Sequence, residues 1–180
     1  MTYYGGKQLA DSFRTVRKNT LTIAEEIPED KYSFRATPET RSVGQLLTHI
    51  GLGHRLQQQV HVDDKRSTFE GFNFPAFMQR VGAEEQKSRS KAEIIDLLTR
   101  EGEAWASWLE GLSEAFLAEE VRSSPGMQPP SKTRFEMLLS PKEHEMHHRG
   151  QLMLMQRMIG ITPHLTRHRQ ERMAAAQTRT

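Results

Sequence analysis

Apolar residues recur at intervals of three, four and seven along four stretches of the chain, which is the spacing of one face of an α-helix. The first stretch runs from Leu9 to Ile27 and ends at Pro28, whose ring cannot continue a helix. The second runs from Ser42 to about Val60, the third from Ser90 to Leu112, and the fourth begins at Thr133. No stretch alternates apolar and polar residues convincingly, so the pattern predicts an all-α protein.

Three of the four stretches open with a capping box, in which a Ser or Thr and a Glu or Gln three residues later satisfy each other's backbone amides. The pairs are Ser42 with Gln45, Ser90 with Glu93, and Thr133 with Glu136. The fourth stretch also carries Ser140 followed by Pro141, a second start signal, and it stops at Gly160, which suits a left-handed cap. The sequence therefore predicts either one last helix kinked at Pro141 or a short turn followed by a fresh helix.

Two long connections separate the predicted helices. The first, His61–Arg89, carries four phenylalanines at positions 69, 72, 74 and 77. A structureless connection of this length is unusual in a compact domain, so we expect local helical turns, with the phenylalanines packed over one end of the helices. The second connection, Ser113–Lys132, contains three prolines and a glycine that form turns.

Composition narrows the functional classes. The 180 residues, of which 36% are hydrophobic and 27% charged, suit one folded domain. Cysteine is absent, which excludes a disulfide framework, thiolate zinc ligands, iron–sulfur ligation and a cysteine nucleophile. The N-terminal segment lacks the apolar region of a signal peptide, and no apolar run approaches the roughly 20 residues that a bilayer requires. We therefore expect a cytoplasmic protein without membrane contact.

The excess of positive charge lies at one end of the chain. The formal net charge is +2, but residues 164–180 contain four arginines and one glutamate. We expect residues 1–163 to form the domain and residues 164–180 to be a basic tail that is solvated or frayed. The alternative is a non-enzymatic helical module, stress-related or associated with nucleic acid through this tail. Nucleic acid is the less favoured partner, because its binding requires a basic stripe on the folded body.

The histidines carry the clearest chemical signal. His144 and His148 are four residues apart, so their side chains leave one face of a helix and can grip one metal ion. Both continue the apolar stripe of residues 152–159 and should point into the core. Burial of an imidazole without a hydrogen bond costs about 1 to 3 kcal/mol, which a metal ion or, alternatively, hydrogen bonds to carbonyls or carboxylates would offset. A third ligand must come from another helix, where periodicity favours His49 and His54 equally.

The same segment also reads H-E-x-x-H, the pattern of zinc peptidases in which Glu145 would be the general base. A metzincin would continue with glycine and histidine where this chain has Gln151 and Leu154. The segment after His148 is short for building the substrate cleft of a peptidase. A zinc peptidase is therefore the less favoured interpretation. Otherwise we expect Glu145 and Arg149 to be ordinary charges on the helix surface, and the alternative is that they support the metal ligands from behind.

Two segments together resemble the DinB family, also called the DinB/YfiT metalloenzymes. They are Ser42–Ile50, with the sequence SVGQLLTHI, and His144–Leu152, with the sequence HEMHHRGQL. The likeness extends to the Gly-Ile-Thr-Pro of residues 160–163, and helix order and chain length agree over nearly the whole sequence.

The resemblance implies a four-helix bundle that binds one divalent metal ion, most often Ni or Zn, through one histidine of the second helix and two of the last. In this chain those positions are His49, His144 and His148. The resemblance thus favours His49 over His54, which is left as a candidate pocket residue. We expect His147, which lies off the axis of the pair, to make a hydrogen bond within or between helices.

The resemblance also bears on activity and assembly. It implies a homodimer. The family that the chain resembles includes thiol-dependent transferases and isomerases that use small cellular thiols. Three neutral imidazoles leave the charge of the ion uncompensated and a coordination position open, as in catalytic sites. We therefore expect a metal-dependent enzyme, a hydrolase or a thiol-dependent transferase or isomerase, whose partner is a small molecule such as a low-molecular-weight thiol.

Overall fold

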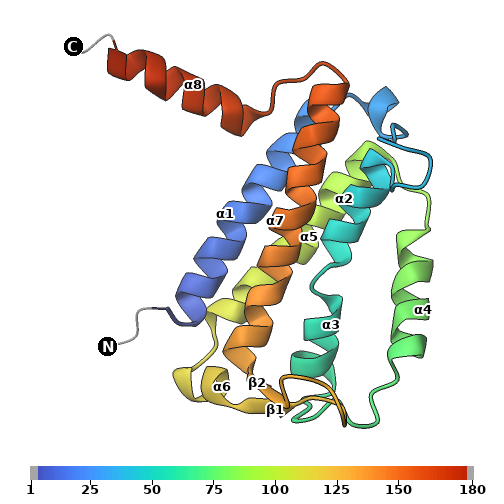
Figure 1. Cartoon of the computed structure of the whole chain (residues 1–180), viewed down its shortest axis with the longest axis vertical. Helices are drawn as coiled ribbons and strands as arrows, with labels where there is room; N and C mark the ends of the chain where they lie inside the picture. The colour runs from blue at the N-terminus through green and yellow to red at the C-terminus, as the bar shows by residue number, and fades with distance from the viewer. Residues whose placement is uncertain (1–3, 178–180) are drawn as a thin grey trace.

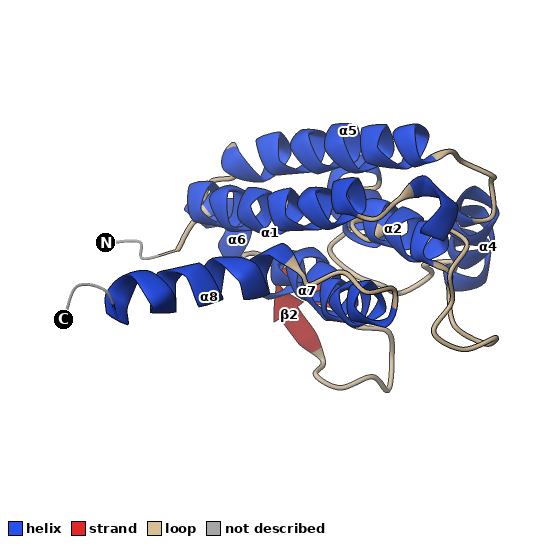
Figure 2. Cartoon of the chain, turned by 90° about the horizontal axis from the view of Figure 1, so that it is seen from above, coloured by secondary structure: helices blue, strands red, loops and turns tan. Residues whose placement is uncertain are grey.

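Four helices lie side by side in the structure, a computed structural model that describes residues 4–177 (Figures 1 and 2). They are α1 (Gly6–Glu26), α2 (Val43–Leu52), α5 (Lys91–Glu110) and α7 (Arg134–Met158). Both α1 and α2 pack against α5 and against α7. The predicted all-α, four-helix bundle is confirmed.

The helix boundaries follow the local signals in the sequence. The predicted capping boxes form at Ser42, Ser90 and Thr133, and each of these side chains accepts a hydrogen bond from the backbone amide three residues later. Helix α1 ends at Glu26, two residues before Pro28. Each end thus satisfies part of its own backbone.

Helix α7 runs through Pro141 without interruption, so the alternative of a turn and a fresh helix from Ser140 is wrong. A proline inside a helix removes one backbone hydrogen bond and crowds the preceding turn. Here the Pro141 side chain is buried, and apolar neighbours on the same helix, Met137 and Leu138, are also buried. Packing of this face therefore outweighs the local start signal.

The second predicted helix is shorter than its apolar pattern suggested. Helix α2 ends at Leu52, and after Gly53 and His54 the chain resumes as the four-residue α3 (Arg55–Gln58) and a π-helical turn at Gln59–Asp63. Glycine has low helix propensity. The break at Gly53 changes the direction in which every later side chain of this stretch points.

The connection between α3 and α5 contains a regular helix, α4 (Phe74–Glu85), which stands beside α2 and α3 (Figure 1). Asn73 caps it by accepting a hydrogen bond from the Ala76 amide, 3.0 Å away. Phe69 and Phe72 pack on a small cluster of buried side chains formed by Val60, Val121 and Met137. The expectation of local helical structure with packed phenylalanines is confirmed.

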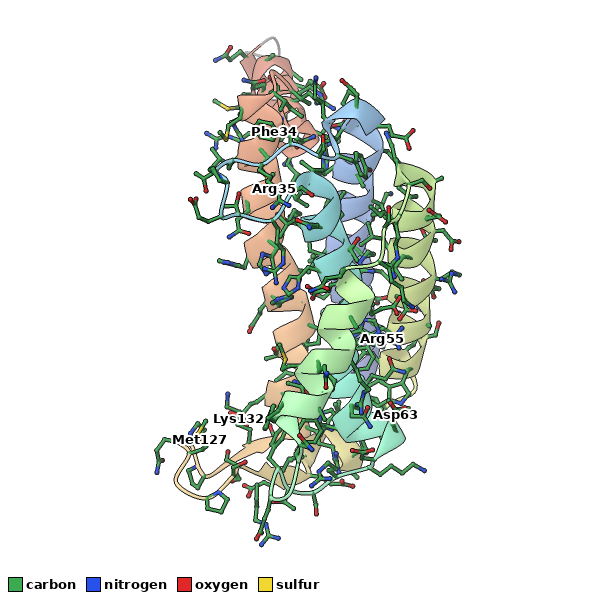
Figure 3. All side chains as sticks on the ribbon, turned by 90° about the vertical axis from the view of Figure 1, so that its right-hand side faces the viewer. Phe34, Arg35, Arg55, Asp63, Met127 and Lys132 are labelled. Carbon is green, nitrogen blue, oxygen red and sulfur yellow. The ribbon has the colours of Figure 1, made fainter. Side chains whose placement is uncertain are left out.

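The second connection forms α6 (Glu114–Ala118) and a short antiparallel hairpin of β1 (Glu120–Arg122) and β2 (Ser131–Thr133). The pattern analysis missed these strands because three residues are too few to show an alternation. Met127 and Lys132 mark this hairpin, at the opposite end of the molecule from Phe34 and Arg35 on the loop before α2 (Figure 3).

Residues 164–177 form a helix, α8 (His164–Gln177), that projects from the end of the bundle (Figure 1). His164 is buried and bonds to Asn19, with Nε2 and Oδ1 3.0 Å apart, and Arg167 pairs with Glu26. Residues 168–177 of α8 are helical and exposed to solvent. Arg179 of the basic tail lies outside the described residues. No described helix has the length and apolarity needed to cross a bilayer.

Candidate metal centre

The three histidines that were predicted as ligands lie together between α2 and α7. Nε2 of His144 is 3.0 Å from Nε2 of His49 and 3.1 Å from Nε2 of His148. One ligand atom from each of the three rings lies within 4.8 Å of the others. The i,i+4 spacing on α7 and the approach of α2 thus bring three imidazoles to one point.

The outer nitrogens of two of these rings have fixed partners. His49 Nδ1 lies 2.5 Å from Oε1 of Glu85, at the end of α4, and His148 Nδ1 lies 2.8 Å from Oε1 of Gln151. A carboxylate and an amide oxygen can only accept, so each Nδ1 carries the proton and donates it. In the neutral rings the lone pair is then on Nε2, which faces the centre of the cluster.

Gln151 is itself held in place. Its amide nitrogen donates a hydrogen bond to Nε2 of His147, 3.3 Å away, which turns its oxygen toward His148. The expected hydrogen bond of His147 is thus observed within α7. His147 supports a neighbour of the cluster and contributes no atom to it.

The third ring, His144, is confined by the break after α2. Its Nδ1 is buried and has no hydrogen-bond partner among residues 4–177. A Cβ added at Gly53 would lie 2.8 Å from this Nδ1, closer than van der Waals contact allows. The glycine that interrupts the second helix therefore makes room for the imidazole.

The cluster fits a metal ion better than it fits protons. Two of its Nε2 atoms hold lone pairs, and Nε2 of His144 carries at most one proton, so at least one of the two short contacts has no proton between its nitrogens. Metal–nitrogen bonds of about 2.0–2.1 Å put neighbouring ligand nitrogens about 3.0–3.4 Å apart, close to the two separations observed. A divalent cation would satisfy all three lone pairs at once.

The surroundings of His144 and His148 favour the neutral form of these two rings. Burial, followed by the charges of His148 and His49, lowers the pKa of His144 to about 4. Burial also lowers the pKa of His148, against the hydrogen bond to Gln151. Neutral imidazole is the form that binds metals, so the site is ready for a cation at neutral pH.

Glu85 places a negative charge behind the cluster. Burial alone would raise the pKa of its carboxyl, but the hydrogen bond from His49 and the charges of His49 and Arg41 outweigh burial and lower that pKa. Its second oxygen, Oε2, lies 3.5 Å from the Arg41 guanidinium. Glu85 is therefore ionised near neutral pH and strengthens His49 as an electron-pair donor.

Glu145 lies away from the cluster, in the core. Its side chain is 1% exposed and accepts hydrogen bonds from Nε and Nη2 of Arg17 at 3.0 and 2.9 Å. Nη1 of the same guanidinium donates to the Leu98 carbonyl. The expectation of a surface charge is wrong for Glu145, and a carboxylate committed to a buried arginine is not available as the general base of a peptidase.

His54 also lies outside the cluster. Its Nε2 is 3.4 Å from Oε2 of Glu101, and its ring packs on Trp105 with centroids 5.2 Å apart. Together with Trp108 these residues line a separate cavity of about 260 Å³. His54 is thus a pocket residue, but the pocket is not the one beside the histidine cluster.

The sequence analysis missed Glu85 and Arg41. Glu85 belongs to no motif, and it reaches His49 because α4 packs beside α2. Arg41 lies on the loop before α2 and lines a cavity of about 600 Å³ that is also lined by His148. An acidic residue at the end of a short helix and an arginine next to a capping serine give too little signal to assign either one.

Comparisons with known proteins agree with this architecture. Residues 12–152 match the model of the DinB superfamily. The chain is 24% identical over 157 residues to YjoA, an uncharacterized protein of Bacillus subtilis, and the match covers 86% of this chain and 91% of YjoA. The crystal structure of YjoA, described as DinB-like, has the same fold, with a TM-score of 0.62 over 86% of this chain and 94% of that chain. The chain therefore belongs to the DinB superfamily.

Proposed function

We propose that this protein binds one divalent metal ion through His49, His144 and His148. The observation that carries the proposal is the convergence of three Nε2 atoms, two of them with lone pairs set by Glu85 and Gln151. Nitrogen ligands suit Ni²⁺ and Zn²⁺ well, and we propose these two as the resident metals.

We further propose that the metal centre is catalytic and acts on a small molecule, as a hydrolase or as a thiol-dependent transferase or isomerase. Three protein ligands leave coordination positions open, which is typical of catalytic sites. When bound, such an ion lowers the pKa of a coordinated water or thiol and so supplies a nucleophile near neutral pH. A cavity of about 600 Å³ beside His148 provides space for a substrate.

The chain's own residues have defined tasks in this proposal. Glu85 holds His49 in one tautomer, and Gln151 does the same for His148. Gly53 leaves the space in which His144 turns its Nε2 toward the other rings.

Metal analysis after equilibrium dialysis tests the metal proposal. Tag-free protein should retain about one Zn²⁺ or Ni²⁺ per chain, as a single site requires, and His144→Ala should lower the affinity at least about 100-fold because it removes one of three ligands. His168→Ala, on α8, changes a histidine outside the cluster and should bind as the parent does. Equal metal content in the parent and His144→Ala would overturn the proposal.

A homodimer, expected from the family resemblance, is part of the same proposal. Sedimentation equilibrium with and without the metal measures the mass of the assembly directly. A single species with the mass of one chain, 20.7 kDa, at concentrations of about 100 μM would overturn it, since dimer interfaces of standard size hold far below that concentration.

A further inference from the structure

The cavity beside the histidine cluster has an identifiable chemical character. Its walls come from three elements: the loop at residues 36–41, α2 through Leu46, and α7 through His148, Gln151 and Met155. Its volume of about 600 Å³ lies within the range of small-molecule sites. His148 belongs both to the cavity wall and to the cluster, so a molecule in the cavity lies next to the proposed metal.

The guanidinium of Arg41 lies on one side of the cavity and has hydrogen-bond donors left for a further partner. The side chain of Arg41 is 46% exposed, and its ion pair with Glu85 is the long contact of 3.5 Å through Nη2. The other oxygen of Glu85 is engaged by His49. Arginine has five N–H donors in a planar fork that matches a carboxylate. Arg41 therefore retains donors for a second, anionic partner.

The charges around the cavity favour that partner. Arg41 carries one positive charge, while Glu39 on the wall and Glu85 behind the cluster carry one negative charge each. Histidines bind a metal ion in their neutral form, so a divalent ion held by the cluster would leave the region with a net charge of about +1, reckoned from formal charges. A single negative charge on the bound molecule neutralises this excess.

The remaining lining is apolar. Leu46 is buried at 4% exposure, Met155 is equally buried, and Leu154 is 57% exposed on the same cavity wall. An apolar side chain left exposed at the edge of a cavity is covered when an apolar group binds there. The wall thus combines one cationic fork with an aliphatic surface.

We propose that this cavity binds a small organic carboxylate, with its carboxylate on Arg41 and its apolar body on Leu46, Leu154 and Met155. The assignment rests on the proposed metal function, because the other end of the molecule then lies beside His148. It identifies the substrate class of the proposed enzyme as a monoanionic, amphipathic acid. Arg41 is the residue that selects for the anionic group.

Binding of hexanoate to the zinc-loaded protein, followed by ¹⁵N chemical shifts, tests this assignment. Hexanoate should shift amides of residues 36–41 and 148–155, and hexanamide, which has the same shape without the charge, should bind at least about 10-fold more weakly. Arg41→Gln should weaken hexanoate binding about 10- to 100-fold, as expected for loss of a charge-assisted pair. Arg100→Gln, which changes an arginine paired with Asp96 on α5, should bind hexanoate as the parent does.

The outcomes separate this assignment from the metal proposal. Unchanged zinc affinity and unchanged melting temperature in Arg41→Gln would show that the loss of hexanoate binding is direct. If zinc does not bind but hexanoate binding still depends on Arg41, the metal proposal fails and the carboxylate site stands. Absence of hexanoate shifts, equal binding of hexanamide, or unchanged hexanoate binding in Arg41→Gln would each overturn the carboxylate site.

Discussion

Replacement of Glu85 by glutamine tests how far the metal centre depends on α4. The substitution keeps the shape of the side chain and an oxygen that can accept from His49 Nδ1, now at 2.5 Å from Oε1. It removes the negative charge, and with it the charge-assisted bond that fixes the tautomer of His49 and raises its basicity.

The size of the effect follows from the two contacts of Glu85. Loss of a carboxylate behind a ligating histidine lowers metal affinity by about 10- to 100-fold, which is about 1.4 to 2.8 kcal/mol. The contact with Arg41 at 3.5 Å is partly exposed and contributes less than about 1 kcal/mol to folding. The variant should therefore fold normally and bind Zn²⁺ more weakly.

Competition with a chromophoric chelator measures the zinc affinity of the parent, Glu85→Gln and a control, Glu84→Gln. Glu84 is the preceding residue of α4, and it pairs with Lys87 and Arg89 instead of a histidine. The control should bind zinc as the parent does. Equal affinity in Glu85→Gln and Glu84→Gln, with both variants folded, would refute the argument that Glu85 tunes the metal ligand.

Three further predictions concern the same core. Gly53→Ala should lower zinc affinity at least about 10-fold because its Cβ would meet His144 at 2.8 Å, whereas Gly150→Ala, with nothing within 4 Å of its Cβ, should leave zinc affinity unchanged; equal zinc affinities would contradict this. Glu145→Gln leaves a buried arginine unpaired and should lower the free energy of unfolding in urea by about 3 to 5 kcal/mol; a loss below about 1 kcal/mol would contradict the role of the pair. Burial lowers the pKa of His61 to about 4, so the fold favours the neutral ring. The free energy of unfolding should therefore fall by up to about 3 kcal/mol as the pH drops from 6.5 toward 4. The lowered pKa values of His144 and His148 act over the same pH range. His61→Gln should therefore reduce the slope of the stability curve by the share of His61, and an unchanged slope would contradict that contribution.

The approach of the two candidate ligands on α7 could be predicted from the sequence because its signal is local. His144 and His148 share one helical face at any position of the helix, so their proximity needed no knowledge of the fold. Periodicity could not distinguish His49 from His54, because it was applied to the whole stretch to about Val60 as one continuous helix. The break at Gly53 separates the two residues, and His54 turns toward Trp105.

The partners of the ligands could not be predicted, because they depend on packing between distant segments. Glu85 reaches His49 across 36 positions of sequence. Arg17 and Glu145 are 128 positions apart, and charged residues of unknown environment are most often exposed. The expectation that Glu145 is a surface charge therefore followed the general preference of charged residues for exposure. It was wrong because Glu145 pairs with the buried Arg17.

The glycine at position 53 and the unbroken course of α7 through Pro141 shape the candidate site. Without glycine at position 53, a Cβ would lie 2.8 Å from Nδ1 of His144. Without the continuation of α7 through Pro141, the i,i+4 pair His144 and His148 would begin a new helix whose direction the bundle would not fix. The bundle accommodates both features because α2 and α7 pack against α5 and α1. The bundle thus fixes backbone positions, while Glu85 and Gln151 fix ring orientations, and a metal site requires both.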